Sequence, residues 1–333
     1  MLPFLLASLE EMAPPEADGP VVVTGAAGAI GGVLVRALLE RGHEVRGVDN
    51  LSTGDRAQLP GGESARRLSF VTADLREPAS LAPVFEGAAA VWHLAANADI
   101  RRGTADPRID LENGTLATFN VLDAARRHDV RAVRFSSSSV VYGRATVLPT
   151  PEEYGPLLPE SLYAANKLAA EGLVSAFAHS YGLEGHIFRF ANIIGPGMNH
   201  GILYDFFEKL RRDPTRLEVL GDGRQAKSYL RTEECVAGML LAADRAHEPV
   251  NLFNLGTTDR ISAREIAEKV VAAHGGRARI ETTGGERGWV GDVPQALLSI
   301  ERIRALGWSP QLTSAEAIDR TIREMQDDRR GAR

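Results

Sequence analysis

Tyr163 and Lys167 form the pair of residues in this sequence whose types and spacing point to acid–base chemistry. A separation of four residues places both side chains on one face of a helix, about one turn apart. A free phenol, with a pKa of about 10, is almost fully protonated at neutral pH, and a neighbouring ammonium favours the phenolate. A phenolate can remove the proton of a hydroxyl group. The same spacing also occurs on solvated helix faces, so its meaning depends on the motifs around it.

Four consecutive serines, residues 136–139, form a second group that could act with this pair. They follow a predicted strand, and Ser138 precedes Tyr163 by 25 residues. Hydroxyl groups at the carboxyl end of a parallel strand lie in the crevice where such folds bind ligands. A serine there can donate a hydrogen bond to a reacting oxygen and pass on its proton. Polar strand ends also bond to the local backbone, and we expect that structural role for some of the four.

A glycine-rich loop containing Gly25, Gly28 and Gly31 lies between a predicted strand and a predicted helix. Glycines allow the backbone to approach a pyrophosphate closely, and the following helix N-terminus offers free N–H groups. Asp49 ends the second predicted strand, 18 residues after Gly31, where an acid can bond to both ribose hydroxyls of adenosine. Because its charge would repel a 2′-phosphate, the pattern favours NAD over NADP. A glycine trio alone also occurs in structural turns.

Two further strand ends carry residues suited to the same cofactor. Asp74 and Leu75 follow the third predicted strand, and the Asp74 carboxylate could meet the adenine amino group. Leu94, Ala95 and Ala96 follow the fourth, where small residues would let the sheet edge lie against the dinucleotide. Each feature also has a structural explanation, namely a helix cap for Asp74 and tight packing for the alanines.

The rest of the chain supplies the elements that would position these residues. Short apolar runs alternate with helical segments up to about residue 195, which is typical of right-handed βαβ units and a parallel sheet. Beyond that point the alternation of strands and helices becomes less regular. Ser262 and Glu265 have the spacing of a helix capping box. We therefore predict an α/β fold, a doubly wound parallel (Rossmann) sheet with a smaller mixed α/β C-terminal substrate lobe. The predicted parts are an N-terminal extension at 1–18, an NAD-binding domain at 19–195 with a return segment at about 228–258, and a substrate lobe at 196–227 and 259–333.

The composition limits the classes of function. A chain of 333 residues with a net charge of −6 lacks the excess of Lys and Arg needed to bind nucleic acid through its overall charge. Cys235, the only cysteine, excludes an intrachain disulfide and fits a cytoplasmic protein. The apolar run near the N-terminus is too short to span a bilayer, and the eight histidines show no metal-ligand spacing. We expect neither a metal nor a membrane partner, and we interpret His93 and the three tryptophans as packing residues.

Together these residues resemble the extended short-chain dehydrogenase/reductase family, and within it the UDP-galactose (UDP-glucose) 4-epimerases. The resemblance runs from about Val21 to Trp308. It is carried by the glycine loop, the serine cluster, the Tyr-x-x-x-Lys pair and further segments at 48–54, 93–96, 189–196, 217–223 and 287–292.

The resemblance implies roles for individual residues. Ser138, Tyr163 and Lys167 match the catalytic serine, base and lysine, with tightly bound NAD taking a hydride from C4 of a UDP-hexose and returning it to the other face. The implied NAD-binding residues are Gly25, Gly28, Ala29, Ile30, Gly31, Asp49, Asn50, Asp74, Leu75, Leu94, Ala95, Ala96, Asn113, Ser136, Tyr163 and Lys167. The implied nucleotide-sugar contacts are Ser138, Tyr163, Asn192, Lys227, Arg287 and Asp292.

Several departures from the family pattern leave alternatives open. Asn166 replaces a smaller residue before Lys167, the stretch 197–201 lacks an arginine found in some relatives, and 231–234 replaces a more apolar stretch. The serine region lacks the acidic pair of the family's 4,6-dehydratases, which favours epimerisation. The alternatives are an epimerase or 4-ketoreductase acting on another sugar nucleotide (UDP-glucuronate, a UDP-N-acetylhexosamine or a dTDP-deoxysugar) and a non-catalytic protein that senses the dinucleotide. The resemblance also implies a homodimer.

Overall fold

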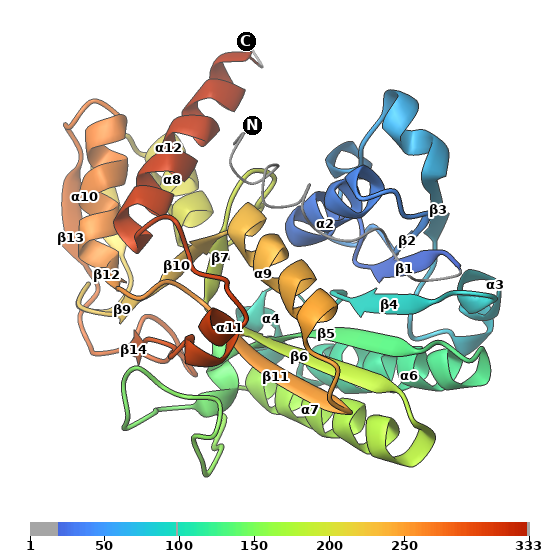
Figure 1. Cartoon of the computed structure of the whole chain (residues 1–333). Helices are drawn as coiled ribbons and strands as arrows, with labels where there is room; N and C mark the ends of the chain where they lie inside the picture. Colours follow the sequence, from blue (N-terminus) through green and yellow to red (C-terminus); the bar gives the residue numbers. More distant parts are fainter. Residues whose placement is uncertain (1–18, 98, 332–333) are drawn as a thin grey trace.

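The computed structural model describes residues 19–97 and 99–331, and the predicted N-terminal extension, residues 1–18, lies outside them. Its centre is a seven-stranded sheet in the order β11-β6-β5-β4-β1-β2-β3, in which every neighbouring pair is parallel (Figure 1). This confirms the predicted doubly wound sheet. The strands are β1 (Val21–Thr24), β2 (Val45–Asp49), β3 (Leu68–Thr72), β4 (Ala90–His93), β5 (Ala132–Ser138), β6 (Glu184–Phe190) and β11 (Val250–Leu255).

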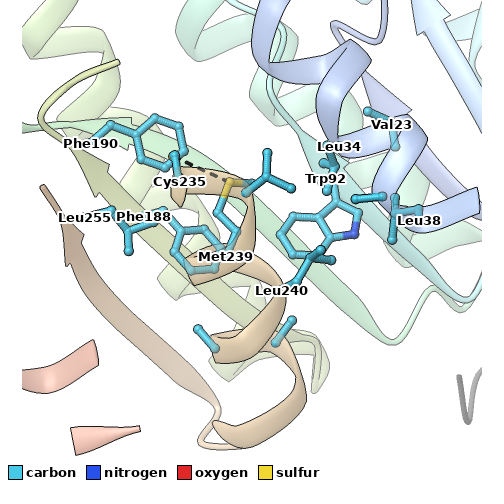
Figure 2. Close-up of a cluster of buried hydrophobic side chains, with 14 of the residues drawn as sticks. Val23, Leu34, Leu38, Trp92, Phe188, Phe190, Cys235, Met239, Leu240 and Leu255 are labelled. Atoms are coloured by element: carbon cyan, nitrogen blue, oxygen red, sulfur yellow. Dashed lines mark hydrogen bonds between the residues drawn. The ribbon is translucent and has the colours of Figure 1, made fainter. Parts of the chain in front are cut away.

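Helices cover both faces of the sheet because its strands are apolar on both sides. On one face, α2 (Ala29–Glu40) and α9 (Thr232–Arg245) pack over β1, β4 and β6. Figure 2 shows the Trp92 indole of β4 beside Leu34 and Leu38 of α2 and Leu240 of α9. On the other face lie α3 (Ala82–Phe85), α6 (Ala117–Arg127) and α7 (Leu162–Tyr181).

The strand order reverses at β1, which pairs with β2 on one side and with β4 on the other. In open parallel sheets a ligand crevice forms at this reversal, outside the carboxyl ends of the strands. The glycine-rich segment follows β1, Asp49 is the last residue of β2, and the 94–96 segment follows β4. The fold therefore gathers the predicted cofactor residues at one edge.

A smaller mixed α/β region follows β6, as predicted. It contains the parallel pairs β7 (Asn192–Ile194) with β10 (Tyr229–Arg231) and β8 (Arg216–Val219) with β13 (Arg279–Thr282). A short sheet joins β9 (Ala226–Lys227) to β12 (Ile261–Ser262) and β14 (Gln295–Ala296). The helices α8 (Ile202–Arg212), α10 (Ala263–Ala273) and α12 (Ser314–Gly331) close around a separate apolar core. The predicted capping box is present at the start of α10.

Two connections tie this region to the sheet. The segment with α11 (Glu301–Ala305) packs Ile303 and Trp308 into the apolar cluster under α9 rather than into the smaller core. Arg231, the last residue of β10, is buried, and its guanidinium bonds both to Glu233 of α9 at 2.8 Å and to Glu324 of α12 at 2.6 and 3.1 Å.

The remaining helices are α4 (Ile100–Ala105), α5 (Pro107–Asp110) and a π-helical turn at Leu111–Leu116 that leads into α6. Within 19–97 and 99–331, no helix combines the length and the apolar character needed to cross a bilayer.

Candidate active site

The glycine loop forms a backbone cradle at the end of β1. Gly25 has a φ of +69°, and a Cβ there would lie 2.8 Å from the backbone nitrogen of Ala95. A Cβ on Gly31 would overlap the carbonyl oxygen of Gly25. Gly28, the N-cap of α2, offers no side-chain oxygen to the first N–H groups of that helix. These groups are therefore available to a phosphate.

Asp49 is fixed at the end of β2 by two backbone bonds. Its carboxylate accepts hydrogen bonds from the N–H groups of Ala27 (3.1 Å) and Leu51 (2.8 Å). Gly54 lies so close that a Cβ there would be 2.9 Å from both carboxylate oxygens. The acid is therefore held beside the loop in the place where a ribose is expected.

A cavity of about 240 Å³ runs from this acid to Tyr163 and Lys167, and its residues fit NAD. Every residue predicted from the sequence to bind the cofactor lines it, from Gly25 through Asp49, Asp74 and Asn113 to Lys167. We propose that each of them contacts the bound dinucleotide.

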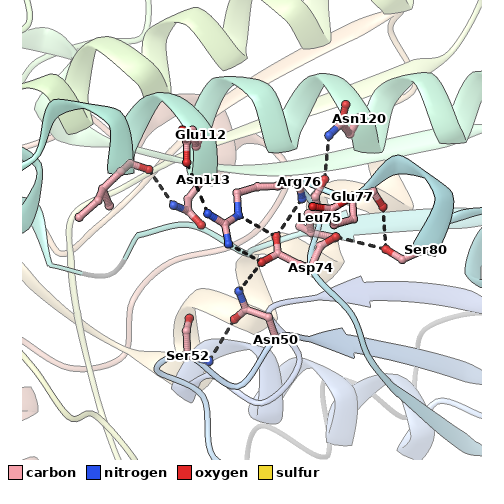
Figure 3. Close-up of polar contacts among 11 residues, drawn as sticks. Asn50, Ser52, Asp74, Leu75, Arg76, Glu77, Ser80, Glu112, Asn113 and Asn120 are labelled. Atoms are coloured by element: carbon pink, nitrogen blue, oxygen red, sulfur yellow. Dashed lines mark hydrogen bonds and ion pairs between the residues drawn. The ribbon is translucent and has the colours of Figure 1, made fainter.

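Asp74 is part of a polar network that the sequence did not reveal. The Arg76 guanidinium bonds to its carboxylate at 3.0 and 2.7 Å, and the Asn50 amide approaches at 3.4 Å (Figure 3). These bonds, chiefly those from Arg76, lower the pKa of Asp74 to about 2. Arg76 also reaches Glu112 at 3.4 Å, next to Asn113 (Figure 3). An adenine amino group would thus meet a carboxylate that Arg76 already orients.

Tyr163 and Lys167 lie on the first turns of α7. Ser161 caps this helix by accepting a hydrogen bond from the N–H of Ala164 at 3.1 Å. The Lys167 ammonium donates to the carbonyl oxygen of Ser136 at 2.6 Å and is 5.7 Å from the centroid of the Tyr163 ring. Burial lowers the pKa of Lys167 to about 8. The lysine is therefore held behind the tyrosine at the cofactor cavity.

Tyr163 itself is half-buried and lines two cavities at once. Burial raises the pKa of its phenol, and the charge of Asp110 acts in the same direction. Formation of the phenolate thus requires positive charge beside the ring. Lys167 supplies one such charge, and an oxidised nicotinamide would supply a second.

All four serines border at least one of the two cavities, and Ser136 and Ser137 also form buried hydrogen bonds within the fold. The Ser136 hydroxyl donates to the carbonyl of His93 at 3.3 Å, and the Ser137 hydroxyl donates to Glu171 at 2.5 Å. Glu171 in turn forms a buried ion pair with Arg189 at 2.7 Å. Ser138 ends β5 and lines the second cavity with Tyr163.

This second cavity, of about 350 Å³, adjoins the first at Tyr163. It is lined by Ser138, Asn192, Lys227 and Asp292 among the predicted substrate contacts. The Lys227 ammonium is 2.6 Å from the Asp292 carboxylate.

Arg287 does not line this second cavity. Its guanidinium pairs with Glu160 at 2.8 Å, which also pairs with Arg144 at 3.3 Å. The loop before Asp292 folds against the start of α7, where a Cβ on Gly291 would lie 2.9 Å from the carbonyl oxygen of Glu160. The structure thus brings five of the six predicted substrate residues together and directs the sixth to an ion pair.

Other residues at the site escaped sequence reasoning. Met198 and His200 line both cavities, and Trp289, interpreted from the sequence as a packing residue, lines the second with its ring 5.1 Å from the Lys227 ammonium. Asn166, a departure from the family pattern, accepts a hydrogen bond from Thr115 at 2.5 Å, a contact that no motif in the sequence predicts. In the described part of the chain, no three acidic, histidine or cysteine side chains gather as a metal site.

Comparison with known proteins assigns this arrangement to a family. The NAD-dependent epimerase/dehydratase family matches residues 21–256, and the chain belongs to it. This confirms the resemblance and NAD as the cofactor.

Particular relatives are similar over nearly the whole chain. The UDP-glucose 4-epimerase of Mycolicibacterium smegmatis is 33% identical over 90% of this chain and 96% of its own length. A crystal structure of a UDP-galactose 4-epimerase is 38% identical with a TM-score of 0.84, covering 93% of this chain and 99% of the other. A dTDP-glucose 4,6-dehydratase from Streptomyces venezuelae, solved with NAD, is 28% identical with a TM-score of 0.85, covering 93% and 98%. The chain is thus similar to family members with different substrates.

Proposed function

We propose that this protein is an NAD-dependent epimerase that inverts C4 of a UDP-hexose of the UDP-glucose/UDP-galactose type. The observation that carries the proposal is the position of Tyr163, which borders the cofactor cavity and the adjoining cavity together. A base in that position can reach a hydroxyl of a sugar in one cavity while the sugar carbon faces a nicotinamide in the other.

The chain's own residues divide the proton chemistry among them. Bound NAD supplies a reversible hydride acceptor at C4. The Tyr163 phenolate takes the proton of the C4 hydroxyl and later returns it to the oxygen of the 4-keto sugar. Lys167 stabilises the phenolate, and the Ser138 hydroxyl donates a hydrogen bond to the same sugar oxygen. Between the two proton transfers the 4-keto sugar would rotate within the site, so that the hydride returns to the opposite face of C4.

The second cavity supports a nucleotide-sugar ligand. Asn192 and Lys227 offer donors to a diphosphate, and Asp292 offers an acceptor to a ribose hydroxyl. Ile100, Val140 and Phe190 contribute apolar surface to the lining of the same cavity. We propose that the region at 196–227 and 259–333 forms this nucleotide-sugar lobe, and that 19–195 with about 228–258 binds NAD.

A second candidate is an epimerase for another sugar nucleotide. It is favoured by the similarity of the chain to a dTDP-glucose 4,6-dehydratase and to a UDP-N-acetylglucosamine 4-epimerase of 25% identity and TM-score 0.83. A 4-ketoreductase is less well supported because Asp49 would repel the 2′-phosphate of NADPH. A non-catalytic sensor would not require the buried Lys167 beside Tyr163.

We also propose a homodimer in the cytoplasm. Leu111, Leu116 and Phe119 are exposed apolar side chains near the start of α6, and Tyr181 is exposed at the end of α7. A single buried cysteine fits a reducing compartment.

The test is turnover of purified protein with UDP-glucose, followed by ¹H NMR of the anomeric proton. We expect conversion to UDP-galactose without added NAD. UDP-glucuronate, UDP-N-acetylglucosamine and dTDP-glucose are assayed in parallel. Conversion of one of those alone would transfer the proposal to that substrate, and no conversion of any would reject an epimerase.

A further inference from the structure

His93 occupies a position under the cofactor cavity that its sequence context did not explain. It is the last residue of β4, is fully buried, and does not line either cavity. Both ring nitrogens have partners, since Nδ1 is 2.8 Å from the hydroxyl of Thr24 and Nε2 is 3.0 Å from that of Thr118. Thr24 directly precedes Gly25 of the dinucleotide loop, whereas Thr118 lies on α6 just after the π-helical turn.

The hydrogen-bond partners of Thr118 determine which ring nitrogen of His93 carries a proton. The Thr118 hydroxyl donates its proton to the carbonyl of Gly114 at 2.7 Å, so its oxygen can only accept from the imidazole. Nε2 of His93 must therefore carry a proton. Burial, reinforced by the charge of Lys167, lowers the pKa of His93 to about 3, so the ring is neutral and Nδ1 is bare.

The hydrogen bonds continue from His93 to the glycine loop. A bare Nδ1 accepts the proton of the Thr24 hydroxyl, whose oxygen accepts in turn from the N–H of Ala95 at 3.3 Å. The bonds thus run in one direction, from Ala95 through Thr24, His93 and Thr118 to Gly114. A neutral imidazole with its proton on Nε2 is the only state of the ring that satisfies all of them.

Both ends of this row of hydrogen bonds lie at the NAD cavity. Gly25 and Ala95 line the NAD cavity at the loop end, and Asn113, adjacent to Gly114, lines it at the other. The turn that carries Asn113 also bonds to α7, because Thr115 donates to Asn166 next to Lys167. The spacing between the dinucleotide loop and the Asn113 turn is therefore set through the imidazole.

We propose that His93 is a positioning residue for NAD, acting as a neutral Nε2–H imidazole that fixes the two ends of the cofactor cavity relative to each other. It touches neither the cofactor nor the substrate. Its loss lets the Asn113 turn and the glycine loop move independently, so NAD leaves faster.

The first test reads the imidazole directly in the unmodified protein with its NAD. In ¹⁵N-labelled protein, two-bond proton–nitrogen NMR correlations distinguish a protonated from a bare ring nitrogen. We expect His93 to have a protonated Nε2 and a bare Nδ1 near neutral pH. A proton on Nδ1, or a doubly protonated ring, would overturn the proposal.

The second test measures the rate at which NAD dissociates from the purified protein, together with its melting temperature. We expect His93→Leu to release NAD at least tenfold faster, and His93→Gln, which keeps one donor and one acceptor, to restore part of the retention. Thr118→Val breaks the chain one step further and is expected to act in the same direction if His93→Leu fails to fold.

His186 provides the matched control. It is a fully buried histidine of β6 whose Nε2 lies 3.0 Å from the carbonyl oxygen of Ala246, away from the NAD cavity. His186→Leu is expected to lower the melting temperature with little change in NAD release. Equal NAD release by the His93, Thr118 and His186 variants would reduce His93 to a packing residue.

Discussion

The ammonium of Lys167 lies 5.7 Å from the centroid of the Tyr163 ring while it donates a 2.6 Å hydrogen bond to the carbonyl of Ser136. The strand that carries the serines therefore holds the lysine behind the tyrosine. Because burial raises the pKa of Tyr163, the charge on Lys167 is needed to favour the phenolate.

This relationship predicts an alkaline limit to catalysis. Burial lowers the pKa of Lys167 to about 8, so its ammonium is present below that pH and is lost as the pH rises through it. We expect the maximal rate to fall above pH 8. Lys167→Met should lower the maximal rate about 100-fold or more and abolish the decrease in rate above pH 8. A Lys167→Met enzyme with the wild-type rate and pH profile would refute the role of the ammonium.

Gly54 gives a test of the ribose acid with a close control. A methyl group there would lie 2.9 Å from both Asp49 oxygens, so Gly54→Ala is expected to displace the carboxylate and weaken NAD binding about tenfold. Gly61→Ala in the same loop region meets no atom within 4 Å and should leave NAD binding unchanged. Calorimetric titration of NAD into the stripped protein measures both. Equal affinities for the two variants would contradict a fixed Asp49.

The buried pair of Glu171 and Arg189 beneath the serines predicts a loss of stability. Both side chains are less than a tenth exposed, and Glu171 also accepts from Ser137. Glu171→Gln leaves the Arg189 charge uncompensated and should lower the free energy of unfolding by about 3 kcal/mol. Glu268→Gln removes an exposed pair with Arg264 and should cost about 0.5 kcal/mol or less. The two variants are compared by their midpoints of unfolding in urea. A midpoint shift for Glu171→Gln no larger than that for Glu268→Gln would contradict the stabilising role of this network.

The proposed homodimer predicts a change of mass on substitution of Phe119. This side chain is 44% exposed beside Leu116, and a charge in an apolar interface is costly. Phe119→Glu should yield a monomer by light scattering. Val147→Glu, at an apolar side chain of similar exposure (51%) in the loop after β5, should leave the mass unchanged. A wild-type monomer would end this proposal.

The sequence predicted the features that depend on local spacing. The glycine loop, the strand end at Asp49 and the Tyr163–Lys167 helix each combine a short motif with one element, and the parallel sheet brings them to one edge. Contacts between segments that are far apart in the sequence could not be predicted from local spacing. Arg287 pairs with Glu160 because the 284–292 loop folds onto the start of α7, and no spacing in the sequence encodes that contact.

Asn166 illustrates the same limit. From the sequence it was only a departure from a family pattern. In the structure Gly114 makes room for it, since a Cβ there would lie 3.0 Å from the Cβ of Asn166, and Thr115 bonds to its amide oxygen. Neither partner could be identified without the fold.

The central claim, that Tyr163 is the base, is tested most directly by the turnover of Tyr163→Phe with UDP-glucose and the other sugar nucleotides, followed by NMR. The variant keeps the ring and the NAD cavity but has no proton to exchange. We predict that C4 inversion falls at least a thousandfold while NAD remains bound. Inversion at the wild-type rate by Tyr163→Phe would contradict the mechanism.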